Sequence, residues 1–347
     1  MTGRPLTIWL PAIRAGSGAD VFVQRLAQGL AEAGHRPLLQ WFDLAYELMP
    51  WRLKRVPAPA GIDLVHAGSW QGFAFARAGV PLVVTEHQYV PHPAFTPYRS
   101  PAQALYHRAH VQPCMRRSYR RANALVAVSR HTACAMQADG APPVQVIHNW
   151  VDCRRFSPAP LPPPDGRPFR LLFVGNPSRW KGADILPALA AQLGARFEIL
   201  CLGGLRRGFR AKGQPANLAL LPRVPPERMP EVYRAADAVL VPTRYEAFGY
   251  VALEAMACGR PVLGFASTGT AEVAVQGETA LLAPMDDLAQ LVDYARRLSG
   301  DAALRQHLGC AGRARALACF DQPQAIAAYL AVYRQALSAC RSQPRAS

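Results

Sequence analysis

Strand-sized apolar runs alternate with amphipathic segments on both sides of a proline-rich break, and this arrangement limits the possible fold. Residues 157–168 contain six prolines, which lack the backbone donor that helices and central strands need, so a stiff, extended linker is expected here. No tandem repeat of a solenoid period is found. Two β/α blocks joined by this linker predict an α/β protein.

The first block begins with an apolar strand at residues 6–10 and a small-residue loop containing Gly16 and Gly18. A helix should follow from about Asp20, because Phe22, Leu26 and Leu30 share one face. Gly34 is expected to end it. Further strands are expected at residues 63–66, 81–85, 124–128 and 144–147.

The second block opens at residues 171–174, a wholly apolar run of the kind found in parallel sheets. Strands are then expected at residues 197–202, 218–221, 238–241 and 261–265, and helices at residues 185–193, 229–236 and 250–258. A last helix over residues 324–337 places Ile326, Tyr329, Leu330 and Tyr333 on one face.

These patterns predict two doubly wound, Rossmann-like domains with parallel sheets that face a central cleft. The predicted divisions are an N-terminal domain at 1–156, a linker at 157–168 and a C-terminal domain at 169–322. The C-terminal helix, 323–347, is expected to cover a domain, and packing back on the N-terminal domain is the favoured arrangement.

Composition limits which classes of partner and which cellular compartment are expected for this chain. A net charge of +16 favours anionic partners. No apolar run reaches the ~20 residues of a spanning helix, and the first run lacks a signal-peptide cleavage pattern. Eight cysteines without a C-x-x-C pair are typical of buried thiols in a reducing compartment. A cytoplasmic protein is therefore expected.

Residues 175–182 combine a glycine at a strand end with two cations before a helix. Glycine lets backbone amides approach a ligand, and the helix terminus and cations favour an anion. Arg179 can chelate a phosphate with two donors, whereas Lys181 acts as a point charge. The alternative is a surface loop with solvated charges.

Two glutamates lie eight positions apart across a helix start. Glu246 follows a buried strand, and Glu254 lies among apolar residues within the helix. Carboxylates suit sugar hydroxyls, and those near a helix N-terminus are favoured by its dipole. Glu246 could instead cap the helix and Glu254 could be solvated. However, a carboxylate in so apolar a helix is costly without a partner, which favours a binding role.

Taken in order, these segments resemble glycosyltransferase family 4, whose members are retaining enzymes with the GT-B fold and two glutamates eight positions apart. The resemblance extends over nearly the whole chain. The matching segments are residues 16–18, 84–87, 128–129, 146–152, 175–182, 236–238, 246–254, 259–262 and 268–272.

The resemblance implies transfer of a sugar from a nucleoside diphosphate-sugar to a hydroxyl of a glycan or lipid-linked acceptor. The pathway implied is synthesis of cell-surface polysaccharide or lipopolysaccharide, and the anomeric configuration would be retained by front-face attack. The implied catalytic residues are Glu246, His87, Lys181 and Arg179. The implied donor-binding residues are Gly16, Gly18, Asn176, Arg179, Lys181, Val224, Glu246, Ala247, Phe248, Gly249, Tyr250 and Glu254.

Individual roles follow from the same resemblance. Glu254 would bind the ribose hydroxyls and Glu246 the donor sugar, while Lys181 with Arg179 would neutralise the diphosphate. His87 would lie under the donor sugar from the other domain. The amides of Phe248 and Gly249 would face the sugar or phosphate, and the Gly16–Gly18 loop would close over the diphosphate.

The sequence departs from the family pattern at three places. Asn176 stands where the family usually has arginine, and Arg179 could supply the charge. Trp150 follows Asn149 where an Asn-Gly turn is usual, and tryptophan does not adopt a left-handed turn cheaply. Residues 221–224 replace a glycine-containing segment before the base-binding loop.

No metal or other cofactor is expected besides the nucleotide-sugar co-substrate. Lys181, Arg179 and helix-end amides can stabilise a departing diphosphate, and no Asp-x-Asp follows a strand. Asp286 and Asp287 are instead typical of a helix N-cap. His87 could be structural, and the spacing of His87, His92, His107 and His110 does not fit a metal site.

A basic stretch at residues 99–121 is the second candidate surface. Peripheral binding to an anionic membrane at the inner face of the cell is expected for Arg108, Arg116, Arg117, Arg120 and Arg121, and a solvated helix face is the alternative. Nucleic acid is not expected, because aromatic residues do not interleave a basic motif.

Other functions remain open at this point. The architecture would also suit a non-catalytic nucleotide-sugar-binding subunit, or a GT-B sugar epimerase or phosphorylase. A Rossmann oxidoreductase is disfavoured, because Gly16-Ser17-Gly18 lacks the third glycine of the dinucleotide motif.

Overall fold

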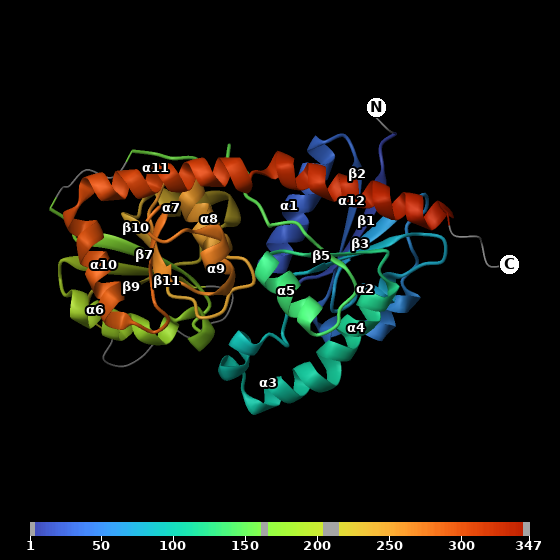
Figure 1. Cartoon of the computed structure of the whole chain (residues 1–347), viewed down its shortest axis with the longest axis horizontal. Helices are drawn as coiled ribbons and strands as arrows, with labels where there is room; N and C mark the ends of the chain where they lie inside the picture. Colours follow the sequence, from blue (N-terminus) through green and yellow to red (C-terminus); the bar gives the residue numbers. More distant parts are fainter. Residues whose placement is uncertain (1–3, 161–165, 204–214, 343–347) are drawn as a thin grey trace. The chain divides into compact units, whose positions relative to one another are not determined.

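The computed structural model describes residues 4–160, 166–203 and 215–342, so residues 161–165 of the predicted linker lie outside it. The chain divides into two compact units (Figure 1). The first contains the residues up to Asn149 together with the segment from Gln322, and the second runs from Trp150 to Asp321. Each unit contains one six-stranded sheet.

The first unit is built on a parallel sheet of order β2-β1-β3-β4-β5-β6. Because β2 lies on one side of β1 and β3 on the other, the strand order reverses at β1. Ligands of doubly wound sheets bind at such a reversal. The strands are β1 Thr7–Ile13, β2 Arg36–Phe42, β3 Leu64–Gly68, β4 Leu82–Glu86, β5 Ala124–Ala127 and β6 Val144–Val146.

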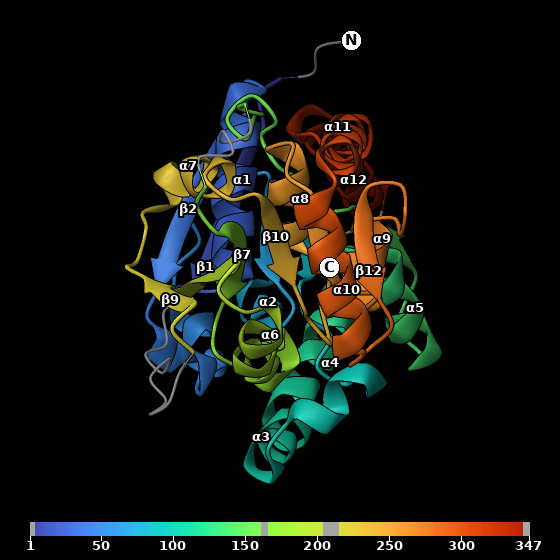
Figure 2. The ribbon, with the colours of Figure 1, turned by 90° about the vertical axis from the view of Figure 1, so that its left-hand side faces the viewer.

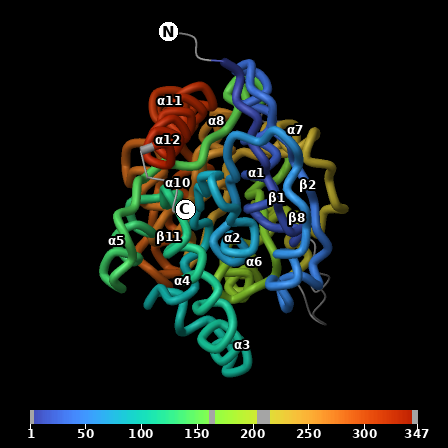
Figure 3. The backbone as a smooth tube through the Cα atoms, turned by 90° about the vertical axis from the view of Figure 1, so that its right-hand side faces the viewer, coloured from blue at the N-terminus to red at the C-terminus, as the bar shows by residue number. Residues whose placement is uncertain are grey.

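Helices cover both faces of this sheet. Helix α1 packs on β1 and β2 and also on α12, whereas α2 contacts β3, β4 and α4. The π-helix at His107–Val111 joins α3 to α4, and Figure 3 shows one continuous helical path. The helices are α1 Gly18–Glu32, α2 Gly72–Phe75, α3 Pro101–Tyr106, α4 Gln112–Arg121, α5 Arg130–Ala138 and α12 Gln322–Ser342.

Helix α12 belongs to the first unit by its contacts. Its predicted apolar face is buried, with Tyr329 and Tyr333 fully enclosed beside Ile326 and Leu330. His66 of β3 lies between this helix and the sheet: its Nδ1 is 2.7 Å from the Tyr333 hydroxyl and its Nε2 is 2.7 Å from Thr85 Oγ1. A buried polar network thus fastens the end of the chain to the first sheet.

The second unit has a parallel sheet of order β12-β11-β10-β7-β8-β9. Its strand order reverses at β7, because the chain first proceeds to β8 and β9 and then returns to β10 on the other side. The strands are β7 Phe169–Gly175, β8 Phe197–Gly203, β9 Leu218–Leu221, β10 Ala238–Val241, β11 Val262–Phe265 and β12 Ala280–Ala283.

One face of this sheet packs on α6 and α10, and the other packs on α8 (Figure 2). Strand residues such as Leu171 and Phe173 enter the first of these layers together with Leu186 and Leu189 of α6. Both faces are therefore apolar, as the continuous apolar strands predict. The helices are α6 Leu186–Leu193, α7 Met229–Arg234, α8 Tyr250–Ala257, α9 Thr268–Val273, α10 Leu288–Gly300 and α11 Ala302–Cys319.

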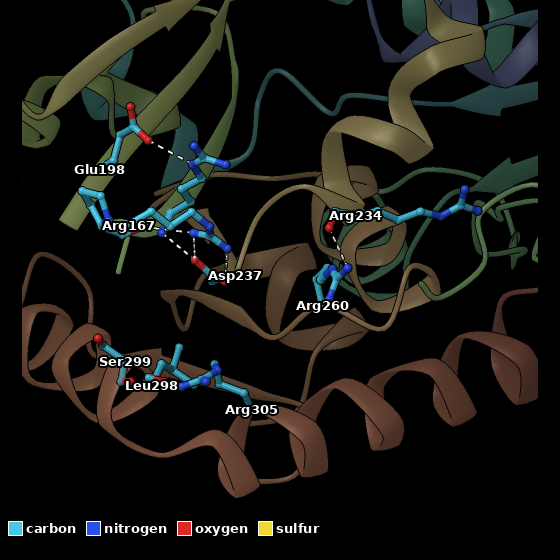
Figure 4. Close-up of polar contacts among 10 residues, drawn as sticks. Arg167, Glu198, Arg234, Asp237, Arg260, Leu298, Ser299 and Arg305 are labelled. Atoms are coloured by element: carbon cyan, nitrogen blue, oxygen red, sulfur yellow. Dashed lines mark hydrogen bonds and ion pairs between the residues drawn. The ribbon is translucent and has the colours of Figure 1, made fainter. Parts of the chain in front are cut away.

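Charged pairs fix the amino ends of neighbouring strands in this unit (Figure 4). Arg167 donates two hydrogen bonds to Asp237, at 2.7 and 3.0 Å, and the same carboxylate accepts the Arg170 amide at 2.8 Å. Arg170 also bonds Glu198 of β8 at 3.1 Å. Asp237 thereby sets β10 beside β7.

The fold prediction of two doubly wound, Rossmann-like units with parallel sheets is confirmed. The sequence patterns did not identify β2, β12 or α11, whereas the helix start expected at Asp286 and Asp287 corresponds to α10. Strand β2 lies at a sheet edge and its residues are only partly buried, so its hydropathy does not resemble that of the central strands. Trp150 is fully buried and has a negative φ, so no left-handed turn forms there.

Candidate functional site

The carboxyl edge of the second sheet brings the predicted donor residues together. Strands β11, β10 and β7 are consecutive in the sheet and parallel, so the loops after them emerge at the same edge. These loops carry Arg179 and Lys181 after β7, Glu246 after β10, and Thr268 after β11. The site therefore lies where the strand order reverses, as in other doubly wound sheets.

Lys181 and Glu246 form an ion pair across this edge. Their side chains are 16% and 18% exposed, so the pair is largely withdrawn from water but still reachable by a ligand. The Lys181 ammonium also lies 4.7 Å from the centroid of the Trp180 ring, a distance at which the ring face attracts a cation. The sequence placed both residues at the site but did not predict their pairing.

Gly182 permits the close approach of the two loops that carry this pair. Its φ is +74°, and a Cβ built there would lie 2.0 Å from the Pro242 carbonyl oxygen. Any other residue would therefore clash with the backbone after β10. A glycine at this position lets the β7 loop pass directly against the β10 loop.

Arg244 ties three loops at the edge and was not identified from the sequence. Its side chain bonds Asp184 at 2.6 Å and Asp286 at 2.5 Å, and it also donates to the Arg179 carbonyl at 2.5 Å. Burial lowers the pKa of Arg244, but the bonds to both carboxylates outweigh this effect and raise the pKa overall. The guanidinium thus remains charged and links the loops after β7, β10 and β12.

The Glu246 backbone is held by the start of α9. Its amide donates to Thr268 Oγ1 at 2.8 Å, and its carbonyl accepts from Gly269 N at 2.9 Å and Thr268 Oγ1 at 2.8 Å. A Cβ on Gly269 would lie 2.6 Å from the Phe248 nitrogen. The position of the Glu246 carboxylate is therefore set by backbone contacts on both sides.

Glu254 is buried in α8 and has the polar partner that its apolar surroundings require. The Tyr233 hydroxyl of α7 donates to Glu254 Oε2 at 2.7 Å, and the residue is only 9% exposed. The sequence predicted that a partner would be needed but could not identify Tyr233. One oxygen of this buried carboxylate is thus fixed by Tyr233.

Several oxygens in these loops are suited to a polar ligand. Asn176 Oδ1 and Ser178 Oγ after β7, together with Ser267 Oγ and Thr270 Oγ1 beside α9, are buried and form no hydrogen bond with a described residue. Buried polar atoms of this kind are rarely left unpaired. Arg179 is exposed at the same edge, so its guanidinium is free to turn toward an anion.

The other predicted donor residues have mixed environments. Ala247 and Phe248 are buried, and Phe248 packs edge-on against Tyr250 and Phe320. Gly249 begins α8 with a left-handed φ. Val224 lies in the partly exposed loop after β9, for which no contact with these residues is observed within the described chain.

In the first unit, the Gly16–Gly18 loop is occupied by an internal carboxylate. Asp20 accepts hydrogen bonds from the amides of Ala15 and Gly16, at 3.3 and 2.8 Å, and Ser17 caps α1. The Ala15 and Gly16 amides of this loop are thus already paired.

His87 lies at the carboxyl edge of the first sheet, partly buried and 4.3 Å from the Phe22 ring, centroid to centroid. Burial lowers its pKa to about 3, so the imidazole is neutral near pH 7. The adjacent Glu86 is fully buried. Desolvation raises its pKa to about 7, although Tyr119 donates to it at 2.6 Å and the Gln88 amide at 3.0 Å.

The aspartates and histidines considered as metal ligands have separate partners in the structure. Asp287 caps α10 by accepting the Gln290 amide, as predicted, but Asp286 instead bonds Arg244. Within residues 4–160, 166–203 and 215–342, no group of three or more His, Cys, Asp or Glu side chains has metal-binding geometry. His92 stacks on His131, and His110 contacts the Glu47 carbonyl at 2.9 Å.

The basic stretch forms an exposed helical surface in part. Its five predicted arginines are exposed, whereas Ser118 and Tyr119 on the other face of α4 are buried. Arg121 also donates to the Phe73 carbonyl at 2.8 Å, so it has a structural role. The five are Arg108, Arg116, Arg117, Arg120 and Arg121. None of the described helices is long and apolar enough to cross a membrane.

Comparison with known proteins agrees with this geometry. Residues 37–155 match the model of Glycosyltransferase Family 4, and residues 159–315 match that of Glycosyl transferases group 1. A D-inositol 3-phosphate glycosyltransferase of Catenulispora acidiphila is 32% identical, over 83% of this chain and 75% of the relative. Its counterpart in Rhodococcus opacus is 31% identical over 78% and 68%, respectively.

Solved structures share the fold. A sucrose-phosphate synthase from Thermosynechococcus elongatus has a TM-score of 0.79 at 22% identity and covers 96% of this chain and 100% of its own. Anabaena HepE in complex with UDP-glucose has a TM-score of 0.75 at 18% identity, with coverage of 95% and 99%. The chain therefore belongs to the family 4-like glycosyltransferases of the GT-B fold.

Proposed function

We propose that this glycosyltransferase binds a nucleoside diphosphate-sugar at the carboxyl edge of the second sheet and transfers the sugar, with retention, to an acceptor hydroxyl. The observation that carries this proposal is the Lys181–Glu246 ion pair beside the buried Glu254. It combines a cation for phosphate with two carboxylates for sugar and ribose hydroxyls.

The reaction breaks the bond between the anomeric carbon and the diphosphate. Lys181, with the exposed Arg179, neutralises the charge that develops on the leaving oxygen. Glu246, held through its own backbone, orients the donor sugar. In front-face transfer, the leaving phosphate takes the proton of the attacking acceptor hydroxyl. These side chains supply the stabilisation in a metal-independent reaction, and His87 borders the sugar as a neutral imidazole.

A uridine diphosphate-sugar is the first donor to test. Anabaena HepE, which shares the fold, was solved with UDP and with UDP-glucose. The acceptor proposed is a glycan or lipid-linked hydroxyl in the synthesis of cell-surface polysaccharide or lipopolysaccharide. A cytoplasmic location at the inner face of the membrane, supported by the exposed arginines of α4, would give access to such an acceptor.

A donor screen tests the proposal. Purified protein is incubated with a panel of nucleotide-sugars and lipid-linked or soluble acceptors, and release of nucleoside diphosphate is measured. We expect turnover with one donor class and a loss of at least about 100-fold in Glu246→Ala, with an unchanged melting temperature. Glu198→Ala serves as the control, since Glu198 lies at the opposite edge of the sheet, beside Arg170.

Each outcome has a distinct meaning. Normal transfer by Glu246→Ala would refute the assignment of this residue. Binding of nucleotide-sugars without turnover by any acceptor would favour a non-catalytic binding subunit. Conversion of the donor sugar to an epimer would favour the epimerase, and release of sugar phosphate with inorganic phosphate would favour the phosphorylase.

A further inference from the structure

An exposed apolar corner lies in the first unit, away from the residues assigned to the donor. It is formed by the turn after β2, where η1 spans Leu44–Glu47 and η2 spans Pro50–Arg55. Leu48 and Trp51 are 60% and 50% exposed, and Leu105 of α3 is 63% exposed. We call these three residues, with Arg52, Lys54 and Arg55, the Trp51 corner.

The structure holds the two parts of this corner together. The Tyr106 hydroxyl donates to the Glu47 carbonyl at 3.4 Å, and His110 contacts the same carbonyl at 2.9 Å. The Trp51 ring also packs edge-on against His110, with centroids 6.1 Å apart. Leu105 directly precedes Tyr106, so its exposed side chain is carried by the helix that contacts this turn.

The Trp51 corner combines this apolar surface with positive charge. Met49, Trp51, Arg52, Lys54 and Arg55 line one open hollow. Residues 48–55 contain no acidic side chain, and none of the three cations forms an ion pair with a described residue. Glu47 of η1 directly precedes this segment and Lys54 also lies 5.7 Å from the Phe73 ring centroid, but the three cations give the hollow an excess of positive charge.

These properties match a bilayer interface. Tryptophan is favoured where one part of a ring meets hydrocarbon and another meets headgroups. Lysine and arginine extend their charged ends to lipid phosphates while their methylene stems remain in the apolar zone. A surface that bound a folded protein would more often pair its charges with a defined geometry, whereas a bilayer accepts flexible, exposed cations.

We propose that the Trp51 corner inserts Leu48, Trp51 and Leu105 into an anionic bilayer, while Arg52, Lys54 and Arg55 bind lipid phosphates. This assigns the membrane contact to a corner that the basic-helix prediction did not include. The inference rests on the proposed function, because a lipid-linked acceptor would give this membrane contact its purpose. Arg108 follows Leu105 by one helical turn and extends the cationic rim.

Flotation with the full chain tests the surface. Vesicles of phosphatidylcholine with phosphatidylglycerol are compared with pure phosphatidylcholine. We expect binding only to the anionic vesicles and a loss of about tenfold in partitioning for Leu48→Ser/Trp51→Ser. Arg52→Gln/Lys54→Gln/Arg55→Gln should abolish the salt-sensitive part. Leu317→Ser is the matched control, because Leu317 is an exposed leucine of α11 in the second unit.

Fluorescence distinguishes insertion from simple charge attraction. Brominated acyl chains should quench tryptophan emission in the parent protein and much less in Trp51→Phe, which keeps an apolar ring but removes the reporter. Equal quenching in both proteins, or full vesicle binding by Leu48→Ser/Trp51→Ser, would overturn insertion. Loss of self-association, without vesicle binding, in the same double variant would assign the corner to a protein contact instead.

Calorimetry with UDP keeps this inference separate from the proposed function. The Leu48→Ser/Trp51→Ser variant should bind UDP as the parent does, because the corner contains none of the residues assigned to the donor. Absence of UDP binding by the parent, together with intact flotation, would contradict the donor proposal while leaving the membrane surface supported.

Discussion

At the carboxyl edge of the second sheet, Lys181 and Arg244 form ion pairs with carboxylates, whereas the first sheet buries His66 and Glu86 and partly buries His87. In the second unit, opposite charges lie in direct contact. In the first unit, burial lowers the pKa of both histidines to about 3 and raises that of Glu86 to about 7, so neutral forms are favoured.

Under the proposed function, the two units would have different roles. The ion pairs of the second edge would supply the positive charge that a departing diphosphate needs, and the neutral groups of the first edge would border the sugar. Changes that remove charge from the second edge should therefore affect transfer most, whereas changes in the first should affect stability and its dependence on pH.

The largest effect is expected for Arg244→Met. It leaves Asp184 and Asp286 without their guanidinium partner and releases three loops. Because both carboxylates are more than a third exposed, unfolding should become easier by about 1–3 kcal/mol, whereas sugar transfer should fall about 100-fold. Thermal unfolding and nucleoside diphosphate release measure the two effects. Arg305→Met, which loses hydrogen bonds to the carbonyls of Leu298 and Ser299 (Figure 4) and a contact with the Phe169 ring, should keep its activity. Full activity of Arg244→Met would show that these loops keep their positions without the Arg244 side chain.

The next effect concerns Glu86 and pH. Because its folded pKa is raised from 4.5 to about 7, the unfolded chain releases this proton first as pH rises. The free energy of unfolding should therefore fall by about 3 kcal/mol between pH 4.5 and 7.

Glu86→Gln should remove this dependence. Native-state hydrogen exchange of the first sheet, in the parent protein and in Glu86→Gln, measures how the free energy of unfolding depends on pH in each. His66 and His87 destabilise the unit as pH falls below 6.5 toward 3, and this opposite slope is common to both proteins. Parallel pH curves would contradict the assigned Glu86 shift.

A smaller effect should distinguish two tyrosines of α12. Tyr333→Phe removes the 2.7 Å partner of buried His66 and should cost about 1–3 kcal/mol. Tyr329→Phe loses a longer, 3.4 Å contact with Thr85, so its cost should be the smaller of the two. Hydrogen exchange in the first unit measures both. Equal costs would mean that the His66 network does not fasten α12.

The sequence predicted the sheets because their central strands are continuous apolar runs, and it predicted the buried face of α12 from helical spacing. Edge strand β2 was missed because a partly exposed strand lacks that pattern. Gly175, Lys181 and Glu246 could be proposed for the site because they stand just after apolar runs, where parallel strands end.

Contacts between loops could not be predicted in the same way. Arg244 resembles the many other arginines of the chain until folding places it between Asp184 and Asp286. Glu254 required a partner, but Tyr233 lies on a separate helix. Asp286 shows the limit of a local pattern: its neighbour Asp287 caps α10, whereas Asp286 adopts a φ of 62° and turns to Arg244.

Calorimetric titration with UDP, GDP and ADP tests the central claim that the second carboxyl edge holds the nucleotide. The parent protein should bind one of these, and both Lys181→Met and Glu254→Gln should weaken that binding at least about tenfold. Glu198→Gln should bind as the parent does. Unchanged affinity in Lys181→Met and Glu254→Gln would contradict the account and place the nucleotide elsewhere.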